Sequence, residues 1–181
     1  GIKPGFIKIA VDAGDTLSVM HAKLIRAAAL THLATGLTIM SHTGPEKPFF
    51  NQLDILEQEG VAPEAFIWTH AQRGTRTSHI EAAKQGVWVS LDNVFPDSAR
   101  IGEYVDMLVN LKQNNLLHRV LLSHDAGWYH VGEPNGGNFR EFIILFKILI
   151  PALSNNGFTD QDIRQILVIN PQKAFTIKVR R

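Results

Sequence analysis

The stretch that decides the fold is residues 37–70, LTIMSHTGPEKPFFNQLDILEQEGVAPEAFIWTH. It begins with an apolar, strand-like run over 37–42 and continues with a helix-like segment over 50–59, which Gly60 follows. A second strand-like run covers 65–70. A strand, a helix and another strand in this order predict a βαβ unit, in which the two strands are parallel.

The same alternation continues on both sides of this stretch. Before it, residues 5–11 predict a strand, and a helix is expected from a Ser18 N-cap to Thr35, with Gly36 as its stop. The remaining expected elements are strands over 87–92 and 119–125, helices over 77–85 and 101–114, and helical pieces over 138–149, 159–168 and 171–176. Strands that read as continuous apolar runs predict a parallel sheet in an α/β fold. A complete (β/α)₈ barrel needs roughly 250 residues, so a chain of 181 residues cannot hold one.

The composition excludes several classes of function. Lys and Arg number 18 against 17 Asp and Glu, so a formal charge of +1 gives no global attraction to nucleic acid or to an acidic membrane. The longest apolar stretch, 142–153, is interrupted by Lys147 and Pro151 and is too short to cross a bilayer. The chain has no Cys, which is compatible with the cytoplasmic location that we expect. Any metal ion must therefore be held by His, Asp, Glu or a modified Lys.

Polar side chains gather where the predicted strands end. Lys8 lies in the first strand, His42 and His70 end the second and third, and Asp125 ends the fifth. Because the carboxyl ends of parallel strands share one face of the sheet, these side chains are expected to converge. A single His or Lys at such a place is more often structural, but the combination in a Cys-free chain favours a metal site. Imidazole and carboxylate suit Zn, Mn, Co or Fe, and an open coordination position would let the metal activate water.

Six short motifs occur together in one order. They are FIKIA at 6–10, SHTG at 41–44, TH at 69–70, SLD at 90–92, SHDAGW at 123–128 and NP at 170–171. In their order and spacing the chain resembles the phosphotriesterase-related proteins of the amidohydrolase superfamily over nearly its whole length. The resemblance implies part of a distorted (β/α)₈ TIM barrel, with this chain supplying about the fourth to eighth strands. Residues 1–181 would then be a single incomplete domain of a metal-dependent hydrolase, with the N-terminal strands absent from this chain.

The resemblance also implies roles for the strand-end residues. Lys8 matches the lysine that bridges two divalent metal ions, zinc first among the candidates, after it has been carboxylated. His42 and His70 match the ligands of the more exposed ion. Asp125 matches the carboxylate that binds the buried ion and accepts a proton from the bridging hydroxide. Since metal coordination lowers the pKa of water from 15.7 to about 7, that hydroxide would attack a lactone, a carboxylic ester or a phosphoester.

Residues around the expected centre are candidates for contact with a small-molecule substrate. Asn93 falls where relatives place a pocket-lining residue, often Arg or His. Trp128 and Tyr129 lie on the loop after the fifth strand, where they could line the pocket or only pack the loop. His124 is on the opposite side of the strand from Asp125, so we interpret it as a structural residue or as a support for a ligand rather than as a ligand itself.

One feature departs from the family pattern. Its members carry a His-x-His pair at the end of their first strand, and this sequence contains none. The chain is therefore expected to be the C-terminal portion of a longer protein, with an open sheet edge that associates with the missing N-terminal part or with a second copy in a homodimer. The alternative is a non-catalytic fragment or binding module that keeps the barrel strands but lacks the complete binuclear site. A doubly wound nucleotide-binding domain is a third reading, although no Gly-x-Gly-x-x-Gly follows the first strand.

Overall fold

The five strands form one parallel sheet whose order follows the sequence. The computed structural model describes residues 1–181, apart from the side chain of Ser98. The strands are β1 (Ile7–Ala10), β2 (Ile39–His42), β3 (Phe66–Thr69), β4 (Trp88–Leu91) and β5 (Val120–Leu122). Each strand pairs in parallel with the next one along the chain. A doubly wound sheet reverses its strand order at a switch point, whereas this order never reverses. The predicted α/β fold, part of a (β/α)₈ barrel, is confirmed.

Four helices connect successive strands. They are α1 (Val19–Thr35), α2 (Glu46–Gln58), α3 (Arg76–Gln85) and α4 (Ser98–Gln113), and short 3₁₀ turns η1 (Pro63–Ala65), η2 (Ala71–Arg73) and η3 (Leu117–Arg119) accompany them. The predicted limits of the first helix are confirmed, because the Ser18 side chain accepts a hydrogen bond from the backbone of His21 and Gly36 closes the helix in a left-handed conformation. Helix α2 begins at Glu46 rather than at Phe50. Its first turn contains Pro48, where a missing N–H costs no helical hydrogen bond.

The C-terminal tail is helical, as predicted, but its boundaries differ. It consists of η5 (Leu145–Leu149), α5 (Ile150–Asn155), α6 (Asp160–Arg164), η6 (Gln165–Ile169) and α7 (Asn170–Ala174), and η5 and η6 are π-helical. Each π segment ends two residues before a proline, Pro151 or Pro171. Proline lacks an N–H and its ring clashes with the carbonyl four residues back, so a wider turn accommodates it. Sequence periodicity of 3.6 residues does not reveal such turns.

The core is tightest around the middle of the sheet. The ring of Phe49 in α2 stacks on Trp68 of β3 with centroids 4.3 Å apart and on Phe66 of the same strand with centroids 5.6 Å apart. Strands β3 and β4 are buried at every residue, whereas β1 alternates between half-buried and exposed positions. The sheet is therefore closed in its middle and open at its β1 edge.

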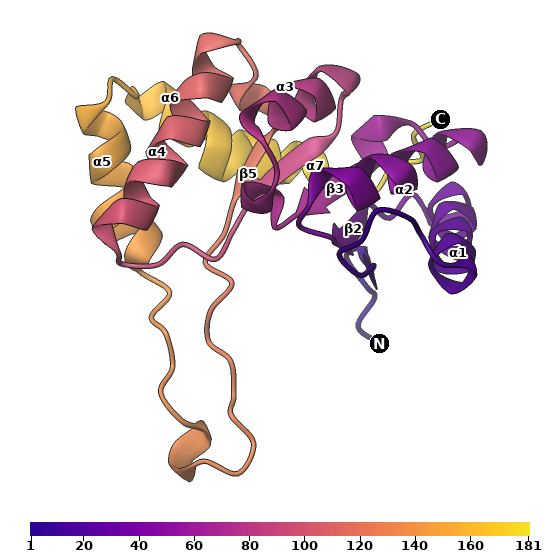
Figure 1. Cartoon of the computed structure of the whole chain (residues 1–181), viewed down its shortest axis with the longest axis horizontal. Helices are drawn as coiled ribbons and strands as arrows, with labels where there is room; N and C mark the ends of the chain where they lie inside the picture. Colours follow the sequence, from indigo (N-terminus) through magenta and orange to yellow (C-terminus); the bar gives the residue numbers. More distant parts are fainter.

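A long loop leaves the sheet after β5 and returns at η5. It projects away from the rest of the molecule and carries the short turn η4 (Pro134–Gly136) near its tip (Figure 1). The predicted helical piece over 138–149 was wrong over its first residues, because 138–143 belong to this loop. Within the described part of the chain, no helix combines the length and the apolar character that crossing a membrane requires.

Candidate metal centre

Three of the four predicted metal ligands meet at the carboxyl ends of the strands. His42 ends β2 and His70 directly follows β3, and their Nδ1 and Nε2 atoms lie 2.8 Å apart. Donor atoms of His70 and Asp125, together with the carboxylate of Asp92, lie within 4.8 Å of one another. The nitrogen and oxygen donors that a divalent ion requires therefore converge on one small volume.

The fourth predicted ligand, Lys8, comes from the open β1 edge. It lines a hollow together with His42. Desolvation lowers the pKa of the Lys8 amine, and the opposing charges of Asp92 and Asp125 partly offset this effect. The amine is therefore within electrostatic reach of both carboxylates and loses its proton more readily than an ordinary lysine.

Asp92 holds His70 in place. This buried residue follows β4, and its carboxylate accepts hydrogen bonds from the backbone N–H of His70 at 2.9 Å and from the Gln72 amide at 3.0 Å. It also contacts Nδ1 of the His70 ring. A carboxylate on one ring nitrogen fixes the tautomer that leaves the other nitrogen available to a metal ion. Because three donors engage the carboxylate, we assign Asp92 to orienting His70. It was assigned no role from the sequence, although it ends the predicted strand 87–92 just as His42 and His70 end theirs.

The backbone at the strand ends is unusual. His70, Asn93 and Asp125 have positive φ values of 61°, 60° and 47°, and they lie just beyond β3, β4 and β5 respectively. The left-handed conformation costs a residue other than glycine about 1–2 kcal/mol. Strain of this kind gathers at functional sites, where the surrounding structure must impose it.

A buried network of hydrogen bonds holds the two residues on either side of His42. The Ser41 hydroxyl donates to the side-chain oxygen of Gln52 at 2.6 Å, and the Gln52 amide donates to Thr43 Oγ1 at 2.8 Å. All three residues are buried. Since breaking a buried network leaves unsatisfied groups at a cost of about 1–3 kcal/mol each, this arrangement keeps the backbone on both sides of His42 in one conformation.

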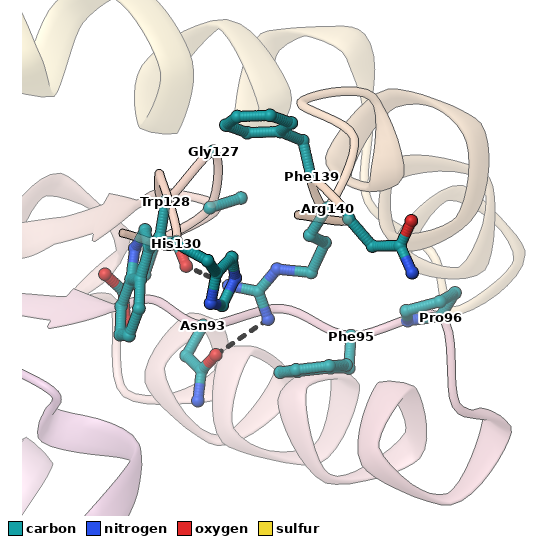
Figure 2. A pocket seen from close by; sticks show the side chains of 11 residues that line it. Asn93, Phe95, Pro96, Gly127, Trp128, His130, Phe139 and Arg140 are labelled. Atoms are coloured by element: carbon teal, nitrogen blue, oxygen red, sulfur yellow. Dashed lines mark hydrogen bonds between the residues drawn. The ribbon is translucent and has the colours of Figure 1, made fainter. Parts of the chain in front are cut away.

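An apolar hollow of about 400 Å³ opens beside the centre (Figure 2). Asn93 and Trp128, both expected to line a pocket, are among its lining residues, together with Phe95 and Phe139. The Arg140 guanidinium lies over the Phe95 ring, 4.0 Å from its centroid, and donates to Asn93 Oδ1 at 2.8 Å. Figure 2 shows these two side chains meeting within the hollow.

Arg140 also ties the long loop to the end of β5. Its guanidinium donates to the backbone carbonyl of His124 at 2.7 Å and to that of Asp125. The His124 ring accepts from the backbone N–H of Leu145 at 3.3 Å, which agrees with its structural interpretation. Tyr129, the third expected pocket residue, lies against Gly136 near the loop tip and is 68% exposed. The role of Arg140 was missed because nothing in local sequence shows where a loop returns.

The chain is similar in sequence to curated proteins that are longer than it is. The chain is 28% identical over 180 residues to the phosphotriesterase homology protein of Escherichia coli, covering 96% of this chain and 60% of that protein. It is also 28% identical over 185 residues to an aryldialkylphosphatase of Saccharolobus solfataricus, covering 96% and 58%. The chain thus spans less than two thirds of the length of these relatives.

Solved structures show the same fold. The Escherichia coli phosphotriesterase homology protein, solved with phosphate in its active site, has a TM-score of 0.83 at 27% identity, covering 97% of this chain and 60% of the other. A lactonase from Listeria monocytogenes has a TM-score of 0.79 at 26% identity, covering 97% and 55%. The family model described as "Phosphotriesterase family" matches residues 1–175. With the motifs, the parallel sheet and the converging strand-end residues in agreement with these matches, the chain belongs to the phosphotriesterase family.

Proposed function

We propose that this chain forms the larger part of a metal-dependent hydrolase that acts on a lactone, a carboxylic ester or a phosphoester. The observation that carries the proposal is the convergence of His42, His70 and Asp125, with His70 oriented by the buried Asp92. The names of an aryldialkylphosphatase and a lactonase among the similar proteins support the same class of reaction.

We propose two divalent ions at these residues. His42 and His70 would hold one ion through imidazole nitrogens, Asp125 would hold the second through its carboxylate, and Lys8, once carboxylated, would bridge the two. Two zinc ions, or Mn, Co or Fe in their place, would when bound polarise the substrate and lower the pKa of water. Lys8 suits its role because only a neutral amine reacts with carbon dioxide and its pKa is already lowered.

The residues around the proposed ions have separate roles. Asp92 fixes the His70 ring, and the buried Ser41 and Gln52 fix the backbone beside His42. The Asp125 carboxylate would accept the proton of the attacking water and pass it on. The apolar hollow in Figure 2 would take the organic part of a small-molecule substrate.

Metal content tests the proposal directly. The 181-residue chain, prepared with a divalent ion and bicarbonate and then dialysed, is expected to retain about two ions per chain and to hydrolyse members of a lactone and ester panel. His42→Ala and Asp125→Asn are each expected to reduce bound metal and to abolish turnover while helical content by circular dichroism stays unchanged. His118→Ala is the matched control, because His118 is exposed and bonds to the carbonyl of Asn115. Retained turnover in the first two variants would contradict the proposal.

A second candidate is a non-catalytic fragment or binding module. The missing His-x-His pair favours it, since the family places two ligands of the buried ion there. One ion or none per chain, with no hydrolysis, is its expected result. Association with a segment that supplies the missing pair, or with a second copy, would then be sought by adding the corresponding N-terminal part and measuring metal content again.

A further inference from the structure

Three hollows meet at the strand ends, and their shared residues show how they connect. The central hollow, of about 300 Å³, contains the candidate ligands from the ends of β2, β3 and β5. It shares Asn93 and Trp128 with the apolar hollow of Figure 2. On the other side it shares His42 and Arg73 with a third hollow of about 710 Å³. The central hollow therefore adjoins both of the others, and Arg73 lines its border with the third.

The stem of Arg73 is held in place. Arg73 ends the short turn η2, and its Cδ lies so close to Gly44 that a Cβ on that glycine would approach it to 2.8 Å. Gly44 has a φ of +80° and its carbonyl accepts a hydrogen bond from the Trp68 indole at 2.9 Å. The glycine thus supplies the space over which the arginine stem lies, and the buried indole fixes the glycine.

Arg73 is exposed and lines both the central hollow and the third hollow. Within the part of the chain that the structure describes, no carboxylate forms an ion pair with its guanidinium. Two carboxylates line a hollow together with Arg73: Asp12, which lies 3.4 Å from the His21 imidazole, and Asp125, which is one of the candidate metal ligands. Arg73 and His42 line the same two hollows. A guanidinium with available donors therefore stands beside one of the candidate metal ligands.

We propose that Arg73 is the anion-binding residue of this site, so that the substrate is an ester or lactone carrying an oxyanion group, a carboxylate or a phosphate, near its scissile bond. The inference rests on the proposed function. The planar guanidinium fork matches two oxygens of such a group. The oxyanion would lie at Arg73, the reacting group at His42 and Asp125, and an apolar part in the hollow beside Phe95.

Binding of simple anions tests the arginine without any reaction. Inorganic phosphate or acetate is titrated into the ¹⁵N-labelled, chelator-treated chain, and the Nε–Hε signals of its arginines are followed by NMR. One signal, absent in Arg73→Gln, is expected to move, and the phosphate dissociation constant is expected to rise at least tenfold in that variant. Arg76→Gln is the matched control, since Arg76 is an exposed arginine that pairs with Asp106. An unchanged affinity in Arg73→Gln would overturn the proposal.

Matched esters test the substrate class on the metal-loaded chain. Mono-4-nitrophenyl succinate carries a carboxylate, and 4-nitrophenyl butyrate is its neutral counterpart with the same leaving group. The ratio of their kcat/KM values is expected to favour the succinate and to fall at least tenfold in Arg73→Gln, mainly through KM. An ester with a phosphonate in place of the succinate carboxylate distinguishes the two anionic groups. The group that the site prefers gives the larger ratio of kcat/KM relative to 4-nitrophenyl butyrate.

The two proposals fail in different ways. If both esters are hydrolysed and the ratio does not respond to Arg73→Gln, the hydrolase proposal stands and the anion site is wrong. If neither ester is hydrolysed but Arg73 still controls phosphate binding, the anion site stands and the hydrolase proposal is wrong for this chain.

Discussion

The middle and the β1 edge of the sheet hold their site residues in different ways. His70, beyond the fully buried β3, is held by the buried Asp92 through both its backbone and its ring. Lys8 lies on β1, where burial alternates with exposure and where the neighbouring Phe6 is 43% exposed. The middle strands therefore position His70 through buried contacts, whereas the edge strand contributes Lys8 without a closed core around it.

Truncating one phenylalanine in each region gives the largest expected difference. Phe49→Ala removes a fully buried ring that stacks on both Phe66 and Trp68, and we expect it to lower the free energy of unfolding by about 3–5 kcal/mol. Phe6→Ala removes a half-exposed ring that contacts Phe175 at 5.8 Å, with an expected loss of about 0.5–1.5 kcal/mol. Urea denaturation of both variants measures the difference. Equal losses would show that the β1 edge is as well packed as the middle.

Asp92→Asn tests the support of His70 in the middle of the sheet. The amide keeps the shape but loses the charge that holds the ring proton on Nδ1, so metal affinity is expected to fall 10–100-fold. Competition with a chelator measures this affinity. Asp106→Asn is the control, because Asp106 is exposed and pairs with Arg76. An affinity unchanged from the wild type would mean that His70 needs no partner for its orientation.

Acid should weaken the middle of the sheet through His79. This buried ring donates through Nε2 to the carbonyl of Ala71 at 2.5 Å and packs against Trp68, and desolvation lowers its pKa below 6.5. The unfolded chain therefore takes up a proton before the folded chain does, so the free energy of unfolding falls as the pH falls below about 6.5, by at most about 1.4 kcal/mol per pH unit for this group. His79→Gln keeps a donor but does not titrate.

Denaturation at several pH values between 5 and 7 measures that slope, with both limits chosen to bracket about 6.5. The His79→Gln variant is expected to have a shallower slope than the wild type. The pKa values of His42 and His124 are also lowered by desolvation, so these two residues contribute to the slope that remains in the His79→Gln variant. Identical slopes in the two proteins would exclude His79 as a source of acid sensitivity.

Lys8→Met should give the smallest change in stability. Lys8 is exposed on the edge strand, so the free energy of unfolding is expected to change by less than about 0.5 kcal/mol, while bound metal falls below two ions per chain. Lys3→Met, on the exposed N-terminal segment, is expected to change neither quantity. A large loss of stability in Lys8→Met would show that the lysine is structural and that the edge is less open than its exposure indicates.

Alternating apolar runs and helical segments were sufficient to predict the sheet and its α/β class. The prediction succeeded there because each strand of this sheet pairs with its neighbour in sequence. The contact between Asn93 and Arg140 joins residues 47 positions apart through a loop without periodicity, so no pattern showed it. The π turns before Pro151 and Pro171 also follow from local clashes that a regular helical period hides.

The candidate ligands could be found because they lie in predicted strands, three of them at the last residue, and Asp92 at the end of 87–92 could have been found by the same rule. Arg73 could not, since its importance comes from the space above Gly44 and from the hollows that it joins. The placement of Tyr129 against Gly136 likewise depends on how the long loop folds back on itself.

The three left-handed strand ends restrict how this site can change. Outside glycine, the residues that most readily accept positive φ are Asn, Asp and His, and the chain has His at 70, Asn at 93 and Asp at 125. These are also side chains that bind metal ions or form hydrogen bonds close to the backbone. The backbone conformation and the chemistry of the site therefore favour the same few residue types. A library of variants limited to Asn, Asp, His and Gly at these three positions would change the reactivity of the site while keeping the fold.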